Sequence, residues 1–140
     1  MSASIETIRD DFSYIDEWED RYRYVIELGE ALPPFPDSAR DEAHRVRGCV
    51  SQVWLLTEIS AGENPVLRFQ GDSDAHIVRG LVAIMLALFS GRHASEILVT
   101  DAEEVLRSLG LDEHLTPQRA NGLRSMVKRI TQDAAIALQE

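Results

Sequence analysis

A cysteine that follows three basic side chains is the most reactive group in this sequence. Cys49 is the only cysteine among the 140 residues, and it follows His44, Arg45 and Arg47. Positive neighbours favour the thiolate, which is the nucleophilic form of cysteine. The apolar residues 53–56 have strand character, so the thiol is expected at a junction between a loop and a strand, where rigid structure can present a reactive group. The sequence therefore predicts a nucleophilic thiol.

Two less specific interpretations of this segment stay open. A lone cysteine often packs as a small buried hydrophobe. The arginines could also do no more than pair with Asp41 and Glu42 on a solvated loop, because exposed ion pairs are common and weak. If the arginines are free, their positive charge in an acidic chain would orient a protein partner and raise its association rate.

Metal and hydrolase chemistry fit this cysteine poorly. A metal site needs three or four ligands at characteristic spacings, and the available histidines are scattered: His44, His76, His93 and His114. A cysteine hydrolase needs a histidine base and an orienting group, yet neither the papain nor the caspase signature surrounds the cysteine. We therefore expect neither a metal nor a bound cofactor in this chain.

One reaction needs only a single thiol. A thiolate can attack the outer sulfur of a persulfide on another protein, accept that sulfur and later pass it to a third thiol, by the displacement that governs thiol–disulfide exchange. A second cysteine would discharge the cargo as a disulfide, and this chain has none. The carrier must also shield its persulfide from oxidants. The pattern thus predicts a covered cysteine that emerges for transfer.

Composition indicates one globular domain over residues 1–140. The 24 acidic residues against 14 basic ones give a formal net charge of -10, which repels nucleic acid and anionic lipid. The longest apolar run, 81–89, is less than half of the roughly 20 residues that a membrane span needs. The acidic start shows no signal-peptide pattern, and a lone cysteine suits a reducing compartment. We expect a cytoplasmic protein with protein partners, no nucleic acid and no membrane.

A small sheet is expected to hold the cysteine segment. The residue pattern predicts a strand over 51–59 that is covered on both faces, and 66–70 return beside it as a hairpin. Because two strands alone are marginally stable, a third strand is expected at 44–48. Residues 71–74 are expected to break the strand pattern.

Helices with recognisable start signals are expected around this sheet. Ser4 and Asp16 can cap the first two helices. A central helix over 77–89 is apolar on every side, which predicts that it is buried, and Ser73 or Asp74 can cap it.

The last third of the chain is predicted to be mainly helical. A short turn at 95–99 is followed by 100–103, which match a capping box. Thr116, followed by proline at the first helical position, opens the last helix. A small antiparallel sheet packed against several helices is an α+β domain.

Four blocks of the sequence resemble the SufE family, the sulfur-acceptor proteins of cysteine desulfurases in iron–sulfur cluster assembly. Residues 47–54, Arg-Gly-Cys-Val-Ser-Gln-Val-Trp, look like the family's cysteine motif. Residues 71–81 are similar to its second block, 109–123 to its third and 24–33 to its early part. The blocks keep the family order and together span about residues 18–130.

This resemblance implies a SufE/NifU-like fold in which Cys49 carries a persulfide on a loop tip against apolar residues. It implies a SufS-like cysteine desulfurase as donor, which is expected to carry pyridoxal phosphate, and a downstream scaffold such as a SufBCD-type complex. The protein would then be a covalent sulfur carrier that stimulates the desulfurase, rather than a stand-alone enzyme. The alternative is a non-catalytic adaptor that regulates the desulfurase through surface contacts.

Asp74 and Arg119 match family motif positions whose implied role is support of the cysteine loop or of the partner face. Asp74 could instead only cap a helix. Arg119 could instead form a surface ion pair, although a cation in the first turn of a helix gains nothing from the helix dipole. Together with Arg45 and Arg47, they are the supporting or partner-binding candidates around Cys49.

Overall fold

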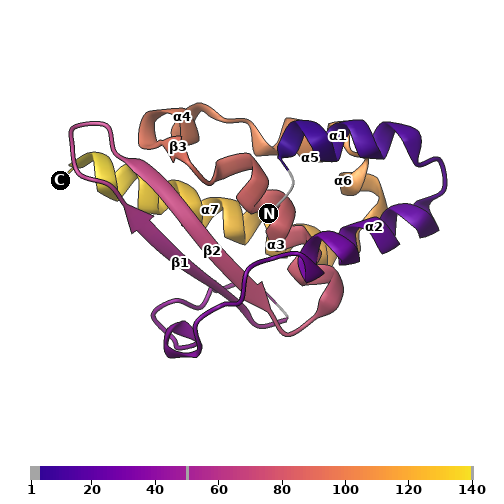
Figure 1. Ribbon diagram of the computed structural model, residues 1–140, viewed down its shortest axis with the longest axis horizontal. Helices are drawn as coiled ribbons and strands as arrows, with labels where there is room; N and C mark the ends of the chain where they lie inside the picture. The colour runs from indigo at the N-terminus through magenta and orange to yellow at the C-terminus, as the bar shows by residue number, and fades with distance from the viewer. Residues whose placement is uncertain (1–3, 50, 140) are drawn as a thin grey trace.

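The computed structural model describes residues 4–49 and 51–139, which form helices around a small antiparallel sheet (Figure 1). The predicted α+β class is confirmed. In chain order the elements are α1 (Ile5–Tyr14), α2 (Trp18–Glu30), the 3-10 turn η1 (Asp37–Ala39), β1 (Val53–Ile59), β2 (Val66–Ser73), α3 (His76–Phe89), β3 (Arg92–His93), α4 (Ala94–Val99), α5 (Ala102–Ser108), α6 (Leu111–His114) and α7 (Pro117–Gln139).

Helix α3 is the centre of the fold. Every residue from Gly80 to Leu86 is buried, as are Leu88 and Phe89. The helix packs on α2 and on β2, and it also contacts α1 and α7 (Figure 1). The prediction of a buried central helix is therefore confirmed. The first turn of α3 follows shortly after the end of β2.

The sheet has the order β1-β2-β3, and all of its neighbouring strands are antiparallel. The third strand is β3, which pairs with the start of β2. The strand predicted at 44–48 is wrong, because Arg45 makes only an isolated bridge to Trp54. The segment cannot continue along β1, since the backbone turns at Gly48 with a φ of 90°.

Both long strands differ in detail from the expectation. Residues 71–74 were expected to break the pattern, but β2 runs on to Ser73. Gly71 permits this continuation, because a Cβ there would lie 2.6 Å from Cγ1 of Val82 on α3. The prediction that β1 is covered on both faces is wrong for its second half, where Ile59 is 48% exposed.

The observed helix starts agree with some of the predicted capping residues and differ from others. Ser4 caps α1 as predicted. Helix α2 begins after Glu17, one residue later than an Asp16 cap would place it, and α3 begins after Ala75; neither start has a side-chain cap. Asp101 caps α5, one residue beyond the predicted start of the capping box.

The C-terminal third contains two short helices that the sequence analysis does not predict, α4 and α6. The predicted turn at 95–99 is the body of α4, at whose start the Glu96 carboxylate accepts the backbone N–H of His93 at 3.1 Å. Helix α7 begins at Pro117, as predicted. Among the described residues, no helix is both long enough and apolar enough to cross a membrane.

Candidate functional site

Gly48 and helix α7 together place the cysteine. The positive φ of Gly48 favours glycine, and a Cβ there would lie 2.5 Å from Oγ of Ser125 on α7. Glycine therefore lets the loop rest directly on the helix. The Cys49 thiol then reaches the carbonyl oxygen of Gly122, with Sγ 3.6 Å from that oxygen in a weak hydrogen bond.

Cys49 is half-buried and lines a cavity of about 220 Å³. The first turns of α3 and α7 supply most of the lining, whose apolar members are Ala75, Ile77, Val78, Leu81, Leu123 and Met126. A Cβ at Gly122 would be 3.6 Å from the sulfur, so the missing side chain keeps the space beside the thiol open. The predicted apolar cover of the cysteine is present.

Burial controls the protonation of the thiol. It raises the pKa of Cys49, and the charge of Arg45 lowers that pKa by a smaller amount. Arg45 thus favours the thiolate as expected, but burial outweighs it, so the net shift of the Cys49 pKa is upward. At neutral pH the thiol is protonated and a poor nucleophile. Movement of the loop into water would remove the desolvation and restore ordinary reactivity.

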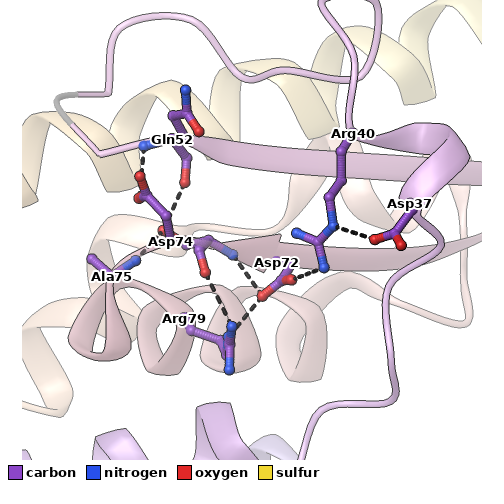
Figure 2. A network of polar contacts seen from close by, with 8 residues as sticks. Asp37, Arg40, Gln52, Asp72, Asp74, Ala75 and Arg79 are labelled. Atoms are coloured by element: carbon purple, nitrogen blue, oxygen red, sulfur yellow. Dashed lines mark hydrogen bonds and ion pairs between the residues drawn. The ribbon is translucent and has the colours of Figure 1, made fainter.

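Asp74 anchors the loop that carries Cys49, here called the cysteine loop, at Gln52. Its Oδ1 accepts the backbone N–H of Gln52 at 3.0 Å, and its own N–H donates to the Gln52 carbonyl at 3.3 Å (Figure 2). The Ser73 hydroxyl donates to the same carbonyl at 2.7 Å. The helix-cap interpretation of Asp74 is wrong, because its carboxylate holds the residue three positions after Cys49.

Asp72, which was not a candidate from the sequence, centres a polar network behind this anchor. Its carboxylate contacts Nη2 of Arg40 at 2.6 Å, Nε of Arg79 at 2.7 Å and the N–H of Ser73 at 2.8 Å (Figure 2). Burial alone would raise the pKa of Asp72, but the hydrogen bonds from Arg40 and Ser73 and the charge of Arg79 hold it below its ordinary value. The network fixes the end of β2 to α3.

The four charged candidates occupy different places around Cys49. Arg45 and Arg47 both pair with Glu42, at 3.4 and 3.6 Å, as the less specific interpretation of these arginines supposes. Asp74 holds the loop. Arg119 is half-buried and lines the cysteine cavity, and none of the ion pairs among residues 4–49 and 51–139 includes it.

We expect a bulky thiol reagent to label Cys49 slowly, because the thiol is half-buried. Labelling should be faster in Asp74→Ala, because this variant loses the anchor at Gln52. The substitution removes the acceptor of the Gln52 N–H. Loss of a hydrogen bond with a net worth of about 1 kcal/mol would raise the opened fraction about fivefold. The thiolate is the form that reacts, and the pKa of Cys49 is raised. The labelling rate should therefore keep rising with pH beyond the pH at which labelling of an ordinary cysteine levels off.

The measurement is the labelling rate from neutral pH upward, with a cysteine peptide as reference. Asp10→Ala is the matched control, since it removes an exposed carboxylate on α1. Labelling of the wild type at the peptide's rate would contradict shielding, and equal rates for the two variants would contradict an anchoring role of Asp74.

Within residues 4–49 and 51–139, no group of three or more His, Cys, Asp or Glu side chains is arranged to hold a metal ion. The Cys49 sulfur lines the cavity together with the polar residues Ser51, Thr116, Gln118 and Arg119, and Gly122 leaves space beside the sulfur.

Comparison with known proteins identifies the family of this chain. The model of the family described as "SufE: Fe-S metabolism associated domain" matches residues 6–134. An uncharacterised SufE-like protein of Rhizobium etli is 58% identical over 135 residues, 96% of this chain and 91% of that protein. One from Rhizobium meliloti is 58% identical over 133 residues, 94% of this chain and 95% of that protein.

A solved structure shows the same fold. The solution structure of a hypothetical protein from Thermus thermophilus is similar with a TM-score of 0.76 and 21% identity, and the match covers 97% of this chain and 96% of that one. The family match spans the cysteine loop, its anchor and the start of α7, which together build the cavity. This chain therefore belongs to the SufE family and has a role in iron–sulfur metabolism.

Proposed function

We propose that this protein is a sulfur carrier that accepts persulfide sulfur from a cysteine desulfurase on Cys49 and passes it to an iron–sulfur cluster scaffold. The observation that supports this most directly is the position of the sole cysteine, at an apolar cavity with an open space beside its sulfur. A catalytic triad or metal centre would need further reactive groups around the thiol. A carrier needs only the thiol and its cover.

The proposed transfer balances without an oxidant. The Cys49 thiolate attacks the outer sulfur of a persulfide on the donor, and a new S–S bond forms at Sγ. The S–S bond of the donor breaks, and its electron pair leaves with the inner sulfur as a thiolate. A downstream thiolate takes the sulfur from Cys49 by the same displacement.

Cover and release place opposite demands on the loop. An S–S bond is about 2 Å long, so the cavity of about 220 Å³ has room for one added sulfur on Cys49. Cover protects the persulfide from oxidants, but burial also keeps the free thiol protonated. Acceptance therefore requires the loop to open at the donor, and closure follows once the sulfur is loaded.

The mass of the intact protein after incubation with a cysteine desulfurase and L-cysteine tests this function. The wild type is expected to gain one or more sulfur atoms, and a reductant should remove them. Cys49→Ser should gain none, because serine has a similar size but offers an unactivated hydroxyl. A wild-type chain that stays at its original mass would overturn the carrier role.

A further inference from the structure

A groove lies beside the segment that precedes Cys49, on the other side of the cysteine loop from the cavity. This groove has a volume of about 530 Å³. One wall is the segment 42–48, through all of its residues except His44, and the other is α7, through Ser125, Lys128, Arg129 and Gln132. The cysteine cavity and the groove share none of their lining residues. The groove is therefore a separate surface.

The charges of the groove oppose those of the whole chain. Its lining holds four cations, Arg45, Arg47, Lys128 and Arg129, and one carboxylate, Glu42. The complete sequence carries a formal net charge of -10. A basic groove on so acidic a protein concentrates the minority sign in one place, where it can orient an oppositely charged partner.

The cations of the groove are only partly neutralised. Glu42 is shared by Arg45 and Arg47, and the Arg47 side chain is 82% exposed. Arg129 is held by Asp133 at 3.5 Å and donates to the Ala43 carbonyl at 3.0 Å.

Lys128 adds a further cation to this surface. Its side chain is exposed, and among the described residues no carboxylate pairs with its amine. An occupant would therefore meet a net positive surface.

The groove also adjoins the thiol. Gly48 rests on Ser125, and Cys49 reaches Gly122 about one helical turn earlier on α7. The thiol of the loop thus faces the apolar cavity, while residues 42–48 wall the groove. A chain bound in the groove would lie beside the segment that must move to expose Cys49.

We propose that this groove docks a short acidic segment of a partner protein. Ser125, Lys128, Arg129 and Gln132 follow helical spacing along about 10 Å of α7. An extended chain rises about 3.3 Å per residue, so the groove spans about three residues. A long polyanion such as nucleic acid fits less well, because the acidic remainder of the chain repels it. The proposal does not depend on whether Cys49 carries sulfur.

Binding of a fluorescein-labelled hexaglutamate peptide, followed by anisotropy at low salt, tests the proposal. The double variant Arg47→Glu/Lys128→Glu should weaken binding about tenfold, because each reversal removes an attraction between a groove cation and a glutamate of the peptide and replaces it with a repulsion. The matched control Arg9→Glu/Arg107→Glu makes the same change of net charge at exposed positions on α1 and α5, and should retain most of the affinity. Salt should weaken the wild-type complex, since exposed charges are screened over about 8 Å at physiological ionic strength.

Lys128 provides a second readout, because it is the only lysine in the sequence. Hexaglutamate should protect Lys128 from an amine acylating reagent relative to the N-terminal amine, as measured by peptide mass. Equal loss of binding in the two double variants, or no protection of Lys128, would overturn the proposal. Tighter binding of a single-stranded DNA hexamer that also protects Lys128 would overturn it in favour of a phosphate site.

Discussion

Cys49→Ser is expected to abolish the stimulation of a cysteine desulfurase over multiple turnovers. A carrier speeds the donor enzyme by removing its persulfide sulfur in each cycle, and only a thiolate at this position can form the new S–S bond. The sequence holds no second cysteine that could take over. Sulfide or alanine release should therefore fall to the rate of the desulfurase alone.

The same measurement separates the carrier from the adaptor. An adaptor acts through surface contacts, which Cys49→Ser leaves almost unchanged because the two side chains are similar in size. Thermal unfolding of the variant provides the control for an intact fold. Wild-type stimulation by a folded Cys49→Ser protein would exclude the carrier mechanism and establish the adaptor alternative.

Gly80→Ala is expected to destabilise the protein by about 3 kcal/mol, at the upper end of the cost of overpacking a core. A Cβ at this position would lie 2.1 Å from the Val25 carbonyl oxygen and 2.6 Å from its Cγ1. The obstacle includes backbone, so α2 and α3 would have to separate. For a chain of this size the melting temperature should fall by about 10 °C, which circular dichroism can follow.

Gly62→Ala is the matched control for this substitution. It adds the same methyl group in the turn between β1 and β2, where nothing lies within 4 Å, but at a φ of 117°. The cost there is backbone strain of about 1 kcal/mol. A smaller loss of stability for Gly80→Ala than for Gly62→Ala would contradict the close approach of α2 and α3.

Short-range chemistry made two helix starts, those of α1 and α7, and the central helix predictable. Ser4 and Thr116-Pro117 act within one helical turn of their own position. The central helix could be recognised because apolar residues cover its whole circumference, which occurs only in a buried helix. The start of α3 could not be predicted, since Ser73 and Asp74 bond to Gln52, 21 and 22 positions away, instead of capping the helix.

The sequence by itself determined the family and singled out one candidate atom, the sulfur of Cys49. The family follows from motifs that lie in order along the chain, and the candidate atom follows from the presence of a single cysteine. Tertiary structure decided how that atom behaves. Burial against α3 and α7 outweighs the cation at Arg45 and raises the thiol pKa. The basic groove likewise joins residues 42–48 to a face of α7 that is about eighty positions away in the sequence. Desolvation and charge act through space, so only the folded chain fixes the sign of their sum.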